Sequence, residues 1–179
     1  MSGPWRPGTK RVDRDSMLRV DQAGEYGATR IYAGQLAILP PNSAAAKLVS
    51  RMAMQERRHL DRFDGLIAER RVRPTALQPI WNFAGFTLGA ATALIGEEAA
   101  MACTDAIETE IDKHYQSQLD DLGDDDPELS ADIAEFRAEE LEHLETARSA
   151  GAERAPAYPL LTGAIRAACR VAIGLSKRI

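Results

Sequence analysis

The chain contains few of the residues on which several classes of protein depend. Its 179 residues include only two cysteines, Cys103 and Cys169, which are far apart and form no Cys-x-x-Cys pair. We therefore expect two small buried thiols in a reducing compartment, not a disulfide or a thiolate metal site. There is also no glycine-rich nucleotide fingerprint and no flavin motif. The chain thus carries no electron relay of its own, and any reductant must come from outside.

Basic clusters and long apolar runs are absent as well. The net charge is −5 and no basic cluster with interleaved aromatics occurs, so nucleic acid is not an expected partner. The longest uncharged run, 74–96, contains Pro79 and several glycines and makes a poor spanning helix. Residues 1–16 lack an apolar h-region, so we expect no secretory signal peptide. We expect residues 1–13 to form a flexible arm and residues 14–179 to form one domain.

The composition that remains favours an all-α protein. Alanine, leucine and glutamate are frequent, aromatic residues make up 6% of the chain, and runs of β-branched residues are scarce. Asp15 or Ser16 is expected to cap a first helix that ends before Pro40, and Pro127 suits the first turn of a later helix. Helices are expected at about 16–39, 43–71, 80–96, 97–122, 127–150 and 160–177.

Two of the histidines occur in the same short pattern. Glu56 precedes His59 by three positions, and Glu140 precedes His143 by three positions. Residues three apart share one face of a helix, so each pair presents a carboxylate and an imidazole in one direction. Such a pair is also found as an ordinary solvated hydrogen-bond pair, which is the competing interpretation.

A further glutamate precedes each pair at a matched distance. Glu25 lies 31 residues before Glu56, and Glu108 lies 32 residues before Glu140. Each pattern spans two helices joined by a short turn, which indicates a duplicated antiparallel hairpin. With a rise of about 1.5 Å per residue, these glutamates lie about 20 to 21 Å from the turn in both hairpins. All six side chains are therefore expected to meet at one point inside a four-helix bundle.

This set of donors favours a site for two redox metals. Carboxylates and imidazoles without thiolates suit iron or manganese, and the same set occurs in di-iron and di-manganese four-helix bundles. Glu56 and Glu140 are the candidates to bridge the ions, with Glu25 and Glu108 as terminal ligands and one histidine for each ion. Four carboxylates and two divalent ions make a neutral cluster, which can be buried without a large charge penalty.

Other polar residues lie near these positions. His114 and Tyr115 are six and seven residues beyond Glu108, close enough to transfer protons at the site. A solvated histidine near the helix end is an equally good interpretation of His114. Asp21 and Asp105 lie about one turn before the terminal glutamates and are candidates to hydrogen-bond the ligands, but surface acids are the favoured interpretation of both.

Two segments outside the ligand helices are apolar or amphipathic. The segment 80–96 contains Trp81 and Phe83. It is explained equally well as a helix that covers the bundle and as an interfacial helix or the mouth of a channel for an apolar substrate. The segment 160–177 combines an apolar face with basic residues such as Arg170. Together the two segments favour contact with a membrane surface.

Longer stretches of the chain resemble the demethoxyubiquinone hydroxylases of ubiquinone biosynthesis. The resemblance covers nearly the whole chain from about residue 14, and motifs of this length are specific. It rests on VDQAGEYGA at 20–28, RIYAGQ at 30–35, RVRPT at 71–75, Trp81 with Asn82, Gly96, AMACT at 100–104, EELEH at 139–143 and CRVAI at 169–173.

The resemblance implies a ferritin-like di-iron monooxygenase. Its two iron ions would be held by Glu25, Glu56, His59, Glu108, Glu140 and His143. It would use O2 to hydroxylate the ring of 6-methoxy-3-methyl-2-polyprenyl-1,4-benzoquinol, with electrons from an external reductant, which in this family is NADH. Members are peripheral membrane proteins, and the mitochondrial ones begin with a transit peptide that is missing here. The implied protein is therefore a bacterial enzyme on the cytoplasmic face of the inner membrane, and other proteins of ubiquinone biosynthesis are candidate partners.

Two other classes of protein remain open. A ferritin-like iron-storage or peroxide-reducing protein would use similar ligands but would not need an apolar crossover helix or a basic amphipathic tail. A non-catalytic helical scaffold would carry the same glutamates as surface charges and would bind no stoichiometric metal.

Overall fold

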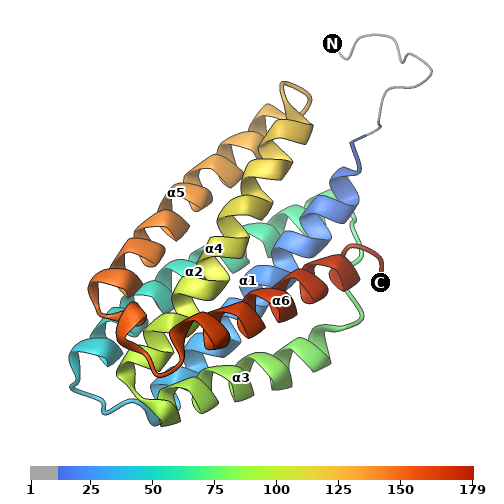
Figure 1. The fold of residues 1–179 in the computed structure, drawn as a ribbon. Helices are drawn as coiled ribbons and strands as arrows, with labels where there is room; N and C mark the ends of the chain where they lie inside the picture. The colour runs from blue at the N-terminus through green and yellow to red at the C-terminus, as the bar shows by residue number, and fades with distance from the viewer. Residues whose placement is uncertain (1–11) are drawn as a thin grey trace.

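Two antiparallel helical hairpins form the centre of the structure (Figure 1). The computed structural model describes residues 12–179, so most of the arm expected at 1–13 lies outside the described residues. In the first hairpin α1 (Arg14–Ile38) packs against α2 (Ala44–Arg70), and in the second α4 (Glu97–Leu122) packs against α5 (Pro127–Ser149). The described residues contain no strand. The prediction of an all-α four-helix bundle is therefore confirmed.

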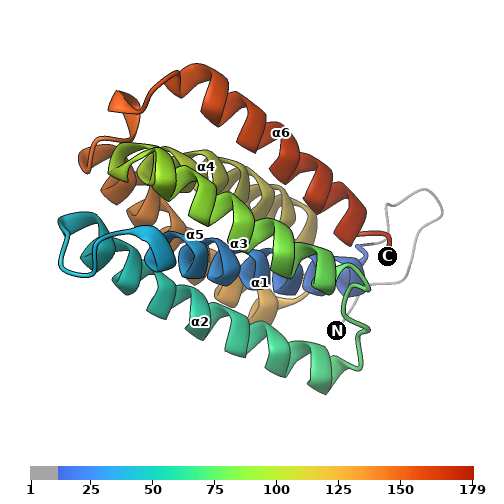
Figure 2. The same ribbon diagram turned by 90° about the horizontal axis from the view of Figure 1, so that it is seen from below.

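Two further helices cover one side of this bundle. α3 (Gln78–Ile95) packs mainly against α1, and α6 (Tyr158–Ser176) packs mainly against α4, after a short 3₁₀ turn, η1 (Ala152–Arg154). Figures 1 and 2 show both helices along the α1 and α4 side, away from α2 and α5. None of the helices in residues 12–179 combines the length and apolar character that a membrane span requires.

The helix ends follow the capping signals of the sequence, with one exception. Ser43 starts α2 by accepting a hydrogen bond from the Ala46 N–H at 3.0 Å. The prediction that Asp15 or Ser16 caps α1 was wrong. Asp13 is the cap, and its side chain accepts a hydrogen bond from the Ser16 N–H at 3.1 Å, which places Ser16 inside the first turn.

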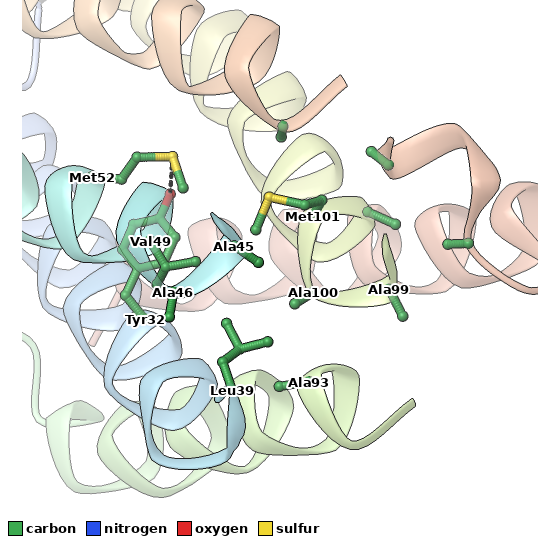
Figure 3. Packing of buried hydrophobic residues seen from close by; sticks show 14 residues of the cluster. Tyr32, Leu39, Ala45, Ala46, Val49, Met52, Ala93, Ala99, Ala100 and Met101 are labelled. Atoms are coloured by element: carbon green, nitrogen blue, oxygen red, sulfur yellow. Dashed lines mark hydrogen bonds between the residues drawn. The ribbon is translucent and has the colours of Figure 1, made fainter. Parts of the chain in front are cut away.

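The apolar core consists of three clusters, one of which joins α1, α4 and α6 while the other two lie toward the ends of the bundle. One cluster lies near the turn between α1 and α2, and Figure 3 shows its small side chains packed around larger ones such as Tyr32 and Met101. A second cluster, which includes Phe63 and Tyr115, lies toward the other end. Burying one large apolar side chain contributes roughly 1.5–3 kcal/mol, so these clusters stabilise the bundle on both sides of its polar middle.

Glycines allow α3 to lie directly on α1. A Cβ atom on Gly89 would lie 1.9 Å from the backbone oxygen of Ile31, and one on Gly34 would lie 2.1 Å from the backbone oxygen of Phe86. Real side chains never approach backbone so closely, so only glycine permits this separation. The same contact sets the width of the space between α3 and the bundle.

Replacing Gly89 with alanine is expected to force α3 away from α1. We expect Gly89→Ala to lower the free energy of unfolding by about 1–3 kcal/mol, the usual cost of overpacking. Gly65→Ala is the control, because nothing lies within 4 Å of a Cβ at this position in α2 and alanine favours a helix. Denaturant titrations that find Gly89→Ala as stable as Gly65→Ala would contradict the close contact.

Candidate metal centre

The structure brings the six glutamates and histidines singled out in the sequence into the middle of the bundle. All six side chains are buried. In each of two groups of four residues, ligand atoms lie within 4.8 Å of one another. The first group contains Glu25 and His59, the second contains Glu108 and His143, and both contain Glu56 and Glu140. The two glutamates predicted to bridge are thus the two that the groups share.

Both histidines turn the same ring nitrogen toward the carboxylates. Nδ1 of His59 lies 3.4 Å from Glu25 Oε2 and 3.2 Å from Glu140 Oε1. Nδ1 of His143 lies 3.2 Å from Glu56 Oε1 and 3.0 Å from Glu140 Oε2. Each imidazole therefore offers one nitrogen to the centre of the cluster, as a metal ligand must.

The opposite nitrogen of each ring is held from outside the cluster. Nε2 of His59 lies 2.8 Å from Glu139 Oε2, and Nε2 of His143 lies 3.0 Å from Gln55 Oε1. An acceptor on Nε2 favours the tautomer in which Nδ1 is free of hydrogen and able to bind a cation. The His59 ring also stacks on Phe136, with the ring centroids 4.1 Å apart.

Two tyrosines link the terminal glutamates across the two hairpins. Tyr32 of α1 donates a hydrogen bond to Glu108 Oε1 at 2.8 Å, and Tyr115 of α4 donates one to Glu25 Oε1. Tyr32 was not predicted from the sequence. Its signal was the repeat itself, because Tyr32 follows Glu25 by the same seven positions that separate Tyr115 from Glu108.

The two acceptors on the histidines were not predicted from the sequence either. Gln55 comes directly before Glu56, and Glu139 comes directly before Glu140. They occupy the same position in the two copies of the pattern, and each contacts the histidine of the other hairpin. A comparison of the two copies residue by residue would have identified both.

Burial of this cluster shifts its proton equilibria. Burial raises the pKa of Glu56 and Glu108, and the charge of Glu140 raises both further. Burial opposes ionisation of Glu140 too, but the imidazoles of His143 and His59 beside it outweigh burial and lower its pKa. Burial alone would lower the pKa of His59, yet Glu140 and Glu25 together raise it to about 10. Positive charge is therefore strongly favoured at the centre of the cluster.

The donors present fit a bound cation. Glu25 Oε2, Glu56 Oε1 and His59 Nδ1 are buried and form no hydrogen bond with other described residues. Buried polar atoms without partners are costly, and a metal ion supplies the missing interaction. Oxygen and imidazole donors without thiolates suit iron or manganese. These buried groups can hold metal.

His114 and Asp21 form a separate buried pair beside the cluster. His114 Nε2 lies 3.1 Å from Asp21 Oδ1, and Gln118 donates a hydrogen bond to the same oxygen at 2.8 Å. Both residues are buried, so the interpretations of His114 as solvated and of Asp21 as a surface acid were wrong. α1 and α4 pack these side chains between them, which a single helix pattern does not reveal.

Asp105 is buried as well, but it belongs to the packing of α6. Its carboxylate lies 3.1 Å from Arg148 Nη2 and 3.8 Å from Arg166 Nη2, and it accepts a hydrogen bond from the Tyr158 hydroxyl. The interpretation of Asp105 as a surface acid was therefore wrong. Among residues 12–179 it bonds to none of the six clustered side chains, so its role is to tie α5 and α6 to α4.

An apolar cavity lies between the bundle and the two covering helices. Its volume is about 180 Å³, and α1, α3, α4 and α6 all contribute to its wall. Gly24 and Ile107 line it, and they come directly before two of the clustered glutamates, Glu25 and Glu108. Trp81 of α3 and Cys169 of α6 line it as well. Of the two cysteines, Cys103 is buried and Cys169 is partly buried, and neither forms a disulfide.

The fold and this site define a four-helix bundle with an internal carboxylate–histidine cluster. Residues 13–176 match the family described as Ubiquinone biosynthesis protein COQ7, and the chain belongs to this family. The family predicted from the sequence motifs is therefore confirmed.

Similar proteins carry the names of hydroxylases. A 3-demethoxyubiquinol 3-hydroxylase from Rhodospirillum rubrum is 56% identical over 165 residues, which cover 92% of this chain and 78% of the relative. The NADPH-dependent 3-demethoxyubiquinone 3-hydroxylase of Homo sapiens is 48% identical over 182 residues, covering 99% and 83%. The 5-demethoxyubiquinone hydroxylase of Saccharomyces cerevisiae is 42% identical over 181 residues, covering 92% and 78%. These names confirm the prediction of an oxygenase-type oxidoreductase.

Metal is expected to stabilise the fold, and more strongly as pH rises. A divalent ion at 100 times its dissociation constant should add about 2.7 kcal/mol to the free energy of unfolding. Because the proton held by His59 must leave when a cation binds, and its pKa is raised to about 10, affinity should increase as the pH rises toward 10. Thermal melts with Co²⁺ or with a chelator measure both effects. The site would be contradicted if metal left the melting temperature of the wild-type protein unchanged. It would also be contradicted if metal raised the melting temperature of Glu56→Ala as much as that of the wild type.

Proposed function

We propose that this chain hydroxylates the ring of 6-methoxy-3-methyl-2-polyprenyl-1,4-benzoquinol with O2, a step of ubiquinone biosynthesis. The observation that carries the proposal is the buried carboxylate–histidine cluster beside an apolar cavity. The names of the relatives identify the substrate as a demethoxyubiquinol or demethoxyubiquinone. A substrate with a polar ring and an apolar tail suits a cavity whose wall is apolar and is formed in part by residues next to two clustered glutamates.

Within this proposal the six clustered side chains would hold two iron ions, which when bound would supply the redox chemistry that activates O2. Glu56 and Glu140 belong to both groups of ligand atoms and would serve both ions, while Glu25 and Glu108 would each serve one. Tyr32 holds the carboxylate of Glu108 in a fixed orientation. The cavity excludes water and directs the quinol ring toward the cluster. The external electron donor in this proposal is a reduced nicotinamide, because the family resemblance implies NADH and the human relative is named NADPH-dependent.

Turnover of the quinol tests the reaction directly. Iron-loaded protein, a reductant and O2 should add one oxygen atom to a demethoxyubiquinol, and mass spectrometry with ¹⁸O2 should find the label in the product. Glu56→Ala should abolish turnover, because it removes a carboxylate shared by both groups. Iron uptake without turnover, together with a cage-sized particle in light scattering, would instead support an iron-storage protein.

We also propose that Tyr115 and His114 move protons during turnover. The hydroxyl of Tyr115 donates a hydrogen bond to a clustered carboxylate, that of Glu25. The adjacent His114 forms a hydrogen bond with Asp21, and burial raises the pKa of Asp21 despite the hydrogen bonds from His114 and Gln118. This pair lies between the site and the end of the bundle, where it can return a proton to Tyr115.

Removal of the Tyr115 hydroxyl is the corresponding test. Tyr115→Phe should lower the single-turnover rate by about 100-fold, the usual contribution of a positioned proton donor. Tyr32→Phe is the matched control, since it removes the equivalent hydroxyl from Glu108 but has no buried histidine–aspartate pair beside it. Equal losses in the two variants, at equal iron content, would show that both hydroxyls only position carboxylates.

We further propose that α3 and α6 place the protein on the cytoplasmic face of the inner membrane. Both helices leave large apolar side chains exposed on the side of the bundle that holds the cavity. Phe83 and Leu94 of α3 are 76% and 71% exposed, and Leu160 of α6 is 75% exposed. A quinol with a polyprenyl tail is dissolved in lipid, so a cavity that opens beside a membrane contact shortens its path. Other proteins of ubiquinone biosynthesis are candidate partners on the same membrane.

Charged substitutions in α3 test this contact. Phe83→Glu is expected to weaken binding to vesicles that contain anionic lipid by at least about tenfold, because burying a large apolar side chain is worth roughly 1.5–3 kcal/mol. Met54→Glu is the control, since Met54 of α2 is also 68% exposed but lies outside the two covering helices. Co-sedimentation that shows equal loss for both variants would contradict the proposed orientation.

A further inference from the structure

The two histidines of the cluster have chemically different partners on their outer nitrogens. His59 Nε2 meets a carboxylate, Glu139 Oε2, at 2.8 Å, while His143 Nε2 meets an amide, Gln55 Oε1, at 3.0 Å. Glu139 and Gln55 occupy equivalent positions in the two copies of the ligand pattern. The two halves of the site are therefore alike in their ligands and unlike in the groups that hold those ligands.

The orientation of both partners is determined by the contacts around them. Gln55 Nε2 donates a hydrogen bond to Glu139 Oε2 at 3.4 Å, which directs its amide oxygen toward His143. The opposite orientation of the amide would place two oxygens against each other. Arg58 binds the other oxygen of Glu139, which keeps this carboxylate ionised and leaves Oε2 facing His59. Glu139 and Gln55 thus link the two imidazole rings through hydrogen bonds. The negative charge of this link is on Glu139, beside His59.

The charge affects the two imidazoles unequally. A carboxylate that accepts the Nε2 proton makes the opposite nitrogen a stronger donor to metal, and a hydrogen bond to a charged acceptor is about twice as strong as a neutral one. His59 receives this effect directly. His143 receives only the weaker dipole of an amide. The shorter distance at His59 agrees with this difference.

We infer that Glu139 and Gln55 make the two metal positions unequal, and that the position of His59 and Glu25 binds its ion first and more tightly. The inference rests on the proposed metal centre. Glu139 acts as a positioning residue, because it touches neither the ion nor the substrate and works through the His59 ring. A protein that must hold two ions at one site thereby acquires a defined order of loading and two ions in different ligand fields.

Stepwise titration of the full chain with Co²⁺ tests this inequality without any measurement of activity. Calorimetry and visible absorption should resolve two binding steps with dissociation constants that differ by about tenfold or more. Glu139→Gln should weaken the first step by about tenfold and bring the two steps together. Glu142→Gln, which removes the same charge from an exposed position on α5, should leave both steps unchanged.

Exchanging the residues at positions 55 and 139 provides the decisive experiment. In the double variant Gln55→Glu with Glu139→Gln, the charge moves to His143 and the order of loading should reverse. His143→Ala and His59→Ala identify the positions, because each leaves one histidine to bind. The inference is overturned if Glu139→Gln changes the steps no more than Glu142→Gln does, or if the exchange leaves the order unchanged. Absence of any Co²⁺ binding by the wild-type chain would instead overturn the metal centre itself, whereas two equal steps would overturn only the inequality.

Discussion

Repulsion among four buried carboxylates is the constraint on which the rest of the structure depends. Glu25, Glu56, Glu108 and Glu140 lie in the interior, where charge is poorly screened. Two histidines alone do not balance four negative charges, and the raised pKa values of Glu56 and Glu108 show how strongly the site favours added positive charge. The apolar clusters at the two ends of the bundle provide the stability needed to hold such a site together. The fold thus stabilises an arrangement that is unfavourable until a cation completes it.

The two hairpins complete the site only together. The hydroxyl of Tyr32 in the first hairpin holds Glu108 in the second, and Tyr115 in the second holds Glu25 in the first. The histidines follow the same rule, since each is held by a residue of the other hairpin. A hairpin alone would expose its carboxylates and leave its tyrosine without an acceptor. Because each hairpin holds ligands of the other, the site forms only when the two hairpins pack together.

The sequence predicted the parts of the site that depend on spacing within one helix. The Glu-x-x-His pairs share a helix face by geometry alone, and the matched upstream glutamates indicated the hairpins. Contacts between helices were less predictable, because they depend on how two helices are shifted and rotated against each other. This is why Asp21 and Asp105 were misassigned as surface acids. Asp105 is covered by α6, and only the observed packing of that helix shows that Arg148, Arg166 and Tyr158 surround it.

The helices α1 and α4 each serve two purposes on opposite faces. One face of α1 points Glu25 into the cluster, while Gly24, Gly27 and Ile31 line the apolar cavity. In α4, Glu108 points inward, and Ile107 and Ile111 line the same cavity. The imidazoles and their outer partners come from α2 and α5, on the far side of the cluster. An apolar molecule in this cavity would therefore lie on the α3 and α6 side, away from the hydrogen bonds that orient the histidines. Because Gly89 and Gly34 set how closely α3 approaches α1, the packing of an outer helix shapes this cavity although α3 supplies none of the six clustered side chains.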